Sequence, residues 1–480
     1  MALANELARY DLTGTADLIR RGEIKPEEAI EAAVERIERL NPHYNAVVTP
    51  MFDLAMEQLS QASPTSPLYG APYLLKDLMA EFKGARLTEG SRYLQHMVSD
   101  HDSELVSRLK KAGLIILGKT NTCEFGLLPT TEPKLFGPSR NPWDRERTPG
   151  GSSGGSATAV ASGMVPAAHG NDGGGSIRIP ASCTGLFGLK PTRGRNSMGP
   201  ELGDALGGLG VEHAVTRSVR DSALLLDITA GPCPGDPYWA PPVNRPFINE
   251  VRSDPGKLKI GWSWDTAFGV DISPDCKTAV KDTVSLLSDL GHQVEPASPQ
   301  YDAVALAKAY GVMWGAGCAW GIEYWHRRGL APDPVPEFFE PFTSAMYERG
   351  RKRTAADYLV AVTTIQKAAR QAAQFFTEYD VYLTPTLAQP PLPLGELTST
   401  QDDPMVCGMK AAFWAPFTAL ANASGQPAMS VPLYWNEDNL PVGCHFMSRF
   451  GDEAILFRLA AQLEAARPWK DRRPATPTKP

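Results

Sequence analysis

The sequence predicts a layered α/β protein, because two of its segments alternate between helical and strand patterns. Residues 105–109 have the apolar spacing of an amphipathic helix, Gly113 can end that helix, and residues 114–117 form a short apolar run typical of a buried strand. Residues 258–295 repeat the alternation as strand (258–261), helix (275–290) and strand (292–295). A chain of 480 residues is long enough for one large or two medium domains.

The N-terminal segment has helical spacing. Pro26 suits the first position of a helix, and apolar residues recur at steps of three and four from Ile30 to Leu40. We expect this helix to end at Asn41-Pro42, because proline cannot donate the next backbone hydrogen bond. Further along the chain, residues 60–67 are expected to form a Ser/Pro linker and residues 300–378 a mainly helical region. Residues 381–383 and 428–432 are expected to form strands, and residues 453–464 a final helix.

Composition and charge exclude several classes of function. The chain has 47 Lys and Arg against 54 Asp and Glu, so its net charge of −7 gives no basic excess for binding nucleic acid. No apolar run approaches the ~18 residues of a membrane span, so no membrane contact is expected. The seven cysteines are scattered and never spaced as CxxC. This disfavours a disulfide framework or a zinc site and makes a reducing cytoplasm the expected location.

Three short motifs match enzyme patterns but lack the context that each mechanism requires. Residues 113–120 fit the phosphate-binding pattern GxxxxGK[ST], yet the residues between the glycines are apolar and fit a strand instead of an exposed loop. Residues 107–110 fit SxxK on a charged helical face, without the accompanying motifs. Residues 150–154 fit GxSxG, but the polar, proline-containing segment before them is no strand. An α/β-hydrolase-type esterase is therefore kept only as an alternative.

Two segments combine glycine and serine in a pattern that suits acyl transfer: residues 150–156 (GGSSGGS) and 170–180 (GNDGGGSIRIP). Glycine permits positive φ and close approach, and successive N–H groups in such a turn can converge on a developing oxyanion. Ser176, at the end of the second turn, would lie beside its own anion hole. The alternative is a pair of flexible linkers, which the charged residues Asp172 and Arg178 disfavour.

A serine needs a base to become a nucleophile at neutral pH, and two residues qualify. His169 is nearest to Ser176 in sequence, but its Ala-Ala-His-Gly setting fits the end of a packed strand equally well. Lys76 ends an apolar run, where burial can lower the pKa of an amine and leave a fraction of it neutral. From these residues alone, a structural pair between Lys76 and Asp77 stays open.

These residues, in this order, resemble the amidase signature family of serine hydrolases. PYLLKD around Lys76, GGSSGGS and GNDGGGSIRIPAS follow the family's order, and the interval 176 − 152 = 24 matches its two serines. Further segments, among them GKTNTCEFG, SRNPWD, GLKPTRGR and NASGQPAMSVPL, extend the resemblance over roughly residues 5–470. The resemblance implies that Ser176 is the nucleophile, that Ser152 is a bridging serine after a cis peptide bond, and that Lys76 is the base.

The same resemblance implies the supporting parts of the site. The expected oxyanion donors are the backbone N–H groups of Gly173, Gly174, Gly175 and Ser176. Ser153 and Arg178 fall on positions that support the serines by hydrogen bonding, with Asp172 beside them. Gly173 departs from the family pattern, where many members have threonine, and this raises the expected mobility of the turn.

The resemblance also implies one domain over residues 1–480, with a large mixed β-sheet covered by helices on both faces. We expect N-terminal helices at residues 5–65 and a catalytic core at residues 66–235. A more variable and largely helical substrate-side region is expected at residues 236–380, and a return to the core at residues 381–470. Trp314, Cys318 and Trp320, together with Trp325, are the candidates for a substrate-binding wall. Ordinary helix packing is the alternative for all four.

The activity that the resemblance implies is hydrolysis of carboxamide C–N bonds through an acyl-enzyme, without a metal or organic cofactor. Aryl amides, oligoamides, carbamates and esters are the expected substrate classes. Within the family, the sequence of these motifs is most similar to that of the hydrolases of cyclic 6-aminohexanoate dimers. The glutaminase subunit of a tRNA-dependent amidotransferase stays an alternative. A small-molecule substrate is the expected partner, and a homodimer is left open.

Overall fold

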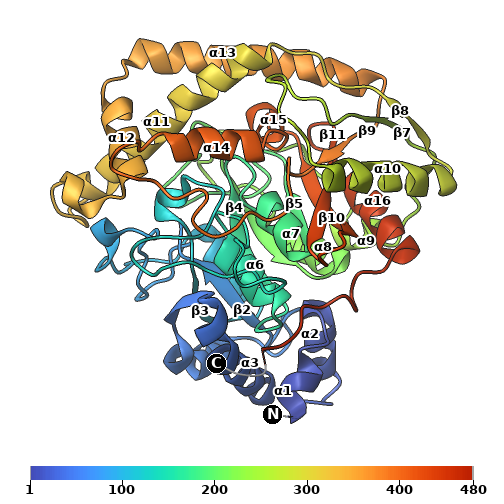
Figure 1. Ribbon diagram of the computed structural model, residues 1–480. Coiled ribbons are helices and arrows are strands. Elements are labelled where there is room, and N and C mark those ends of the chain that lie inside the picture. Colours follow the sequence, from blue (N-terminus) through green and yellow to red (C-terminus); the bar gives the residue numbers. More distant parts are fainter. Residues whose placement is uncertain (1, 478–480) are drawn as a thin grey trace.

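Within residues 2–477, which the computed structural model describes, a single sheet joins strands from nearly the whole chain (Figure 1). Its strands are β1 (Val47–Pro50), β2 (Pro72–Lys76), β3 (Ile115–Thr120), β4 (Ala167–Asp172), β5 (Phe187–Lys190), β6 (Val211–Thr216), β7 (Lys259–Trp262), β8 (Gln293–Pro296), β9 (Val381–Pro385), β10 (Ala428–Trp435) and β11 (Pro441–Ser448). Their order is β1-β3-β2-β4-β6-β5-β10-β11-β9-β7-β8. The sheet is mixed, because β2 pairs in parallel with β3 and β4, whereas β4 and β6 are antiparallel. The α/β class and the large mixed sheet are confirmed.

Helices flank this sheet along its whole length. They are α1 (Ala2–Leu7), α2 (Leu12–Arg20), α3 (Pro26–Tyr44), α4 (Ala55–Gln61), α5 (Glu104–Lys111), α6 (Gly154–Ala161), α7 (Arg178–Thr184), α8 (Val219–Thr229), α9 (Phe247–Glu250), α10 (Pro274–Asp289), α11 (Ala303–Arg327), α12 (Pro341–Arg351), α13 (Ala355–Ala373), α14 (Val406–Trp414), α15 (Ala419–Ser424) and α16 (Glu453–Ala466). In Figure 1, α11 and α13 lie at the top, and α1, α2 and α3 lie at the bottom. No helix in the described part of the chain is both long enough and apolar enough to cross a membrane.

Alternate side chains of β2 show that helices cover both faces of the sheet. Leu74 packs in a buried cluster with residues of α3 and α6. Tyr73 and Leu75 point to the opposite face and pack in a second cluster with residues of α2, α5 and α8. Because successive side chains of a strand point to opposite faces, burial of all three requires a layer of helices on each side.

The helix–Gly–strand and strand–helix–strand units form as predicted. The Ser103 hydroxyl caps α5 by accepting from the Val106 N–H at 3.4 Å, and β3 follows after Gly113. Three of the four apolar residues between the glycines of the GxxxxGK[ST] match lie in β3, as expected, and Leu114 directly precedes it. β7, α10 and β8 form the second unit, and β7 pairs with β8 in parallel. Residues 236–380 therefore supply two strands of the sheet as well as the helices α11, α12 and α13.

The predicted end of the first long helix is wrong. Helix α3 continues through Pro42 to Tyr44. Pro42 removes only one backbone donor, and the Asn45 N–H closes the final turn by donating to the Asn41 carbonyl at 2.8 Å. The Asn41 side chain then accepts from the next two backbone N–H groups, at 2.8 Å each. These bonds hold the last turn in place of the missing donor.

Candidate active site

Pairing of β2 with β4 brings Lys76 to the centre of the site. Lys76 is the last residue of β2 and is fully buried. Its Nζ lies 2.7 Å from the Ser152 Oγ and 2.6 Å from the Asn171 Oδ1, at the end of β4. A neutral amine in this position can donate one N–H to the Asn171 amide oxygen and accept the Ser152 hydroxyl proton.

Burial lowers the pKa of Lys76 to about 8, although the nearby carboxyl groups of Glu212 and Asp172 act in the opposite direction. Near neutral pH a minor fraction of this amine is therefore uncharged, and this neutral fraction can act as a general base. The alternative pairing with Asp77 is wrong, because that carboxylate accepts from the Thr88 N–H at 3.1 Å and from the Thr88 hydroxyl at 2.5 Å.

The other candidate base, His169, is occupied on both ring nitrogens. Its Nε2 contacts the Glu212 carboxylate, and its Nδ1 accepts from the Lys76 N–H at 3.2 Å. The ring is fully buried within β4 and serves to hold β2 and β4 together. The packed-strand interpretation of this histidine is the one that the structure supports.

Ser152 follows a non-proline cis peptide bond, Gly151–Ser152, and its side chain is almost fully buried. Only glycine fits before it, since a Cβ on Gly151 would lie 2.1 Å from the Thr130 carbonyl oxygen. The segment precedes α6 directly and follows irregular chain, so the strand that a nucleophile elbow needs is missing among the described residues there. Ser153 connects both serine segments: its Oγ donates to the Asn171 carbonyl and its N–H to the Ser176 carbonyl, each at 3.3 Å.

The turn at residues 173–176 has every carbonyl oxygen hydrogen-bonded. The Tyr310 hydroxyl donates to the Gly173 carbonyl, and the Thr418 hydroxyl donates to the Gly174 carbonyl at 2.5 Å. The carbonyls of the other two residues accept from backbone N–H groups, at 2.7 and 3.3 Å. Hydrogen bonds from several elements therefore hold the turn in place. The bond from Tyr310 restrains Gly173 and counters the mobility that glycine at this position was expected to give.

One predicted oxyanion donor is already in use. The Gly175 N–H donates to the Asp172 Oδ1 at 2.8 Å, so the expectation that it serves in the oxyanion hole is wrong. The N–H groups of Gly173, Gly174 and Ser176 have no hydrogen-bond acceptor within residues 2–477. Three main-chain donors therefore remain for a substrate oxygen beside the Ser176 hydroxyl.

Replacing Gly175 with alanine is expected to lower kcat/KM by at least about tenfold and to destabilise the fold by about 1–3 kcal/mol. Gly175 has a φ of +135°, and an added Cβ would lie 2.6 Å from the Thr418 Oγ1 and 2.7 Å from the Ile179 Cδ1. Steady-state kinetics and thermal unfolding measure the two effects. Gly22→Ala is the matched control, because Gly22 also has positive φ but has open space around it. Equal kinetic effects of both substitutions would contradict this interpretation of the turn.

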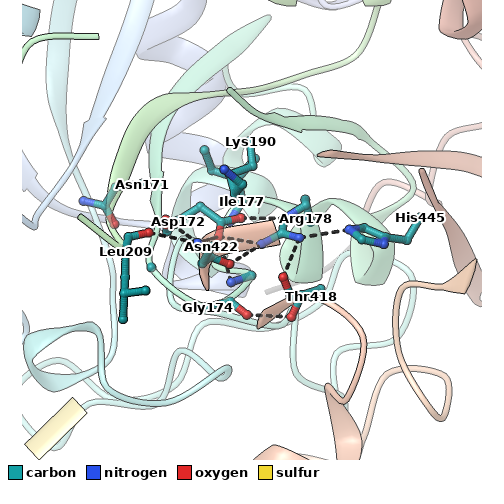
Figure 2. A network of polar contacts seen from close by, with 12 residues as sticks. Asn171, Asp172, Gly174, Ile177, Arg178, Lys190, Leu209, Thr418, Asn422 and His445 are labelled. Carbon is teal, nitrogen blue, oxygen red and sulfur yellow. Dashed lines mark hydrogen bonds and ion pairs between the residues drawn. The ribbon is translucent and has the colours of Figure 1, made fainter. Parts of the chain in front are cut away.

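An ion pair beneath the turn holds it on the sheet (Figure 2). Arg178 and Asp172 are fully buried, and two parallel bonds of 2.9 Å join the guanidinium to the carboxylate. The same carboxylate accepts from the Gly175 N–H and, at 3.2 Å, from the Ile177 N–H. Burial alone would raise the pKa of Asp172, but Arg178 and the hydrogen bonds hold that pKa well below its usual range.

Residues distant in sequence complete this network, and sequence reasoning missed them. The Arg178 guanidinium donates to the Thr418 carbonyl at 2.9 Å, the Asn422 Oδ1 at 2.6 Å and the His445 Nε2 at 2.9 Å. Asn422 also donates to the Asp172 carbonyl at 2.9 Å. The segment NASGQPAMSVPL, which carries Asn422, was part of the family resemblance, but nothing in it indicated this role.

Two open pockets meet at Ser176. Pocket A is a space of about 1240 Å³, the open solvent at its mouth included, and is lined by Ser152, Asn171 and Ser176, among others. Pocket B is a space of about 2100 Å³, measured in the same way, and reaches Ser176 past Tyr310, without Ser152 in its wall. Trp314 belongs to both walls. Among the described residues the Ser176 hydroxyl has no hydrogen-bond partner, and no hydrogen bond joins it to the Ser152 hydroxyl. The Ser176 hydroxyl is therefore free to approach a substrate between the two pockets.

The candidate wall residues of α11 all line pocket A. The Trp314 indole N–H donates to the Leu127 carbonyl at 3.1 Å, and its ring stacks on Tyr310 with a centroid distance of 5.7 Å. Trp320 is 40% exposed at the pocket, whereas Cys318 and Trp325 are buried. Burial raises the pKa of the Cys318 thiol well above its usual range, so it lacks the thiolate character of a nucleophile. A substrate contact for these residues stays a prediction.

Comparison with known proteins agrees with this geometry. The family described as Amidase matches residues 28–457, most of the chain. The chain belongs to the amidase family. It is 38% identical over 479 residues to the 6-aminohexanoate-cyclic-dimer hydrolase of Paenarthrobacter ureafaciens, covering 97% of this chain and 96% of that protein.

Solved structures of other amidases have the same fold. A 6-aminohexanoate cyclic dimer hydrolase complexed with substrate superposes with a TM-score of 0.92 at 36% identity, covering 98% of this chain and 99% of that one. A bacterial aryl acylamidase of the amidase signature family superposes with a TM-score of 0.87 at 26% identity, covering 97% and 99%. The amidase signature fold expected from the sequence is therefore confirmed.

Proposed function

We propose that this amidase hydrolyses carboxamides through an acyl-enzyme on Ser176, with Ser152 as the proton relay and Lys76 as the base. The observation that carries this proposal is the contact of 2.7 Å between the buried Lys76 Nζ and the Ser152 Oγ, in a pocket wall that also contains Ser176. Unpaired main-chain donors beside Ser176 supply the electrostatic stabilisation that an acyl-transfer transition state requires.

The proposed reaction begins with attack of the Ser176 Oγ on the substrate carbonyl carbon. As the bond forms, the Ser176 proton passes to Ser152, whose own proton passes to the Lys76 amine. The negative oxygen of the tetrahedral intermediate is bound by the N–H groups of Gly173, Gly174 and Ser176. On collapse of the intermediate the C–N bond breaks, and Ser152 returns a proton to the departing amine. Water then cleaves the acyl-enzyme by the same relay in reverse.

The pockets favour apolar or aromatic amides over short polar ones. Pocket A has aromatic side chains in its wall, Phe125 and Trp314 among them, and pocket B extends past Tyr310 and Phe342. The names of the relatives add oligoamides of 6-aminohexanoate and aryl amides as specific candidates. Carbamates and esters present the same carbonyl to Ser176, and esters need less help at the leaving group.

A panel of purified substrates tests the proposed activity. It contains p-nitroanilides, esters, carbamates, linear and cyclic oligoamides and L-glutamine, each assayed with the chain alone. Turnover of anilides or oligoamides, with little ammonia from L-glutamine, is the expected result. Ammonia release from L-glutamine that requires added subunits, with no turnover of the other compounds, would support the glutaminase alternative instead.

The pH profile is expected to follow Lys76. Because the base must be neutral and its pKa is lowered to about 8, kcat/KM should rise between pH 6 and pH 8 and level off above. Lys119→Met is the matched control: Lys119 is equally buried and its pKa is also lowered to about 8 by burial, but its Nζ contacts the Ala80 carbonyl. The Lys119→Met variant should show the same rise of kcat/KM with pH. A flat pH profile of kcat/KM in the unaltered enzyme would exclude Lys76 as the base.

A further inference from the structure

Pocket A is lined by four buried acidic side chains. Asp172 and Glu212 pair with Arg178 and His169, and the proposed reaction does not use the other two. Glu81 and Glu89 both line the pocket and are only 7% and 6% exposed. The Glu81 Oε1 lies 3.6 Å from the His101 Nε2 at the pocket wall. Its Oε2 is buried and, like the nearby Ser99 Oγ, has no hydrogen-bond partner of good geometry within residues 2–477, although the Ser99 hydroxyl is close enough to lower the pKa of Glu81. A buried carboxylate oxygen without a donor is costly, so a cationic ligand would satisfy it.

The surroundings of Glu89 also favour a cation. Burial raises the pKa of Glu89 to about 8, and the neighbouring carboxyl groups of Asp77 and Glu81 add to this rise. Three carboxyl groups are therefore close enough to repel one another when charged. The charge of Arg328 lowers the pKa of Glu81, but this guanidinium lies against the rings of Tyr324 and Trp325, at 5.3 and 5.5 Å, and is not among the residues that line the pocket.

The backbone around these carboxylates is strained. Met79, Glu89, Phe125 and Leu206 have φ values of +63°, +51°, +50° and +55°, and all four line pocket A. Such conformations are unfavourable for residues other than glycine and concentrate at ligand-binding sites. The positive φ of Glu89 is held in part by the Phe125 N–H, which donates to the Glu89 carbonyl at 2.8 Å.

The position of Ser152 decides which half of a substrate enters pocket A. In the proposed reaction Ser152 gives a proton to the departing amine, so the amine half must lie on its side of Ser176. Ser152 lines pocket A, whereas pocket B reaches Ser176 without it. The aromatic side chains Trp320, Tyr324 and Trp325 line pocket A and can pack against an alkyl chain or the face of a cation.

We propose that pocket A binds the amine half of the substrate and that Glu81 and Glu89, in its wall, bind an ammonium group. The preferred substrates are then mono-acylated alkanediamines, whose apolar chain separates the scissile amide from a primary ammonium. Assignment of the amine half rests on the proposed function, whereas the cation-binding site itself rests on the unpaired carboxylate and the pocket.

Matched amides test the preference in the unaltered enzyme. N-(6-aminohexyl)hexanamide carries the ammonium on the amine half, and N-heptylhexanamide replaces it with a methyl group. We expect kcat/KM for the first to exceed that for the second by about tenfold or more. 6-Amino-N-heptylhexanamide places the ammonium on the acyl half and should show no such advantage. Equal rates for the first two, or a preference for the third, would overturn the proposal.

Isosteric variants assign the preference to the two carboxylates. Glu81→Gln and Glu89→Gln should each reduce the ratio of the two rates severalfold. Glu437→Gln, on an exposed residue away from both pockets, is the control and should leave the ratio unchanged. A ratio that both pocket variants leave intact would refute the role of these residues.

A binding measurement separates this proposal from the proposed function. Hexane-1,6-diamine and hexan-1-ol are titrated calorimetrically into the Ser176→Ala enzyme, which needs no turnover. We expect the diamine to bind at least about tenfold more tightly than the alcohol, and Glu81→Gln to remove that difference. Diamine binding without amide turnover in the parent enzyme would support the cation site and reject the proposed amide hydrolysis. Equal binding of the two compounds would reject the cation site.

Discussion

The Ser176→Ala enzyme is expected to lose amide hydrolysis, with kcat/KM falling by roughly 10⁴–10⁶-fold. Removal of the Oγ removes the atom that forms the acyl-enzyme, and the Lys76–Ser152 pair then has no nucleophile to activate. The same substitution should abolish labelling by a fluorophosphonate probe. Because the Ser176 hydroxyl has no hydrogen-bond partner among the described residues, the free energy of unfolding should change by no more than about 0.5 kcal/mol.

A second buried serine provides the control for this prediction. Ser182 lies in α7, six residues beyond Ser176, and its Oγ accepts from the Gly443 N–H at 2.9 Å. Ser182→Ala should therefore lose some stability but keep both labelling and hydrolysis. Labelling and full activity in the Ser176→Ala enzyme, measured in the same assay, would remove Ser176 from the role of nucleophile.

The sequence predicted the elements whose patterns are local. The repeats of apolar residues in α3, α5 and α10 indicated helices, and the short apolar run before Lys119 indicated β3. β6 gave no such signal, and β4 gave only an ambiguous one in the Ala-Ala-His-Gly setting of His169, because all residues of both strands are buried and their sequences, AAHGND and VEHAVT, have no alternation of polar and apolar residues. β4 also carries Asn171 and Asp172, so part of the site lies on a strand that the sequence indicates only weakly.

The residues of the candidate site also divide into those that the sequence indicated and those that only the folded structure shows. Lys76, Ser152 and Ser176 lie in segments of unusual composition, and the resemblance to a family indicated their order. The partners that fix the oxyanion turn, Tyr310 and Thr418, lie more than 130 residues further along the chain and meet it only in the folded protein. A glycine-rich sequence also indicates that backbone N–H groups can converge on one point, but it does not indicate which of these groups lack a hydrogen-bond acceptor. The family resemblance implied that the Gly175 N–H serves in the oxyanion hole, and only the folded structure shows that it binds Asp172 instead.

Replacement of Arg178 with methionine is expected to destabilise the fold by about 3–5 kcal/mol, because it leaves the buried Asp172 carboxylate without its cation. Arg178 lowers the pKa of Asp172 in the folded state, so the ion pair contributes its full stability above the ordinary pKa of an aspartate. That contribution is lost only as pH falls through the lowered value. The loss on substitution should therefore be complete at pH 7, as measured by denaturant unfolding.

The kinetic effect of this substitution should exceed what instability alone produces. Asp172 holds the Gly175 and Ile177 N–H groups on either side of Ser176, and a protonated or displaced Asp172 would release the turn. Arg195→Met is the matched control, since Arg195 forms a buried pair with Glu453 at 2.9 Å outside the walls of pockets A and B. Both variants should lose stability, but only Arg178→Met should also lower kcat/KM per folded molecule, by about tenfold or more. Equal kinetics in the two folded variants would reduce the Asp172–Arg178 pair to a purely structural role. A difference would show that this buried ion pair positions Ser176 for catalysis.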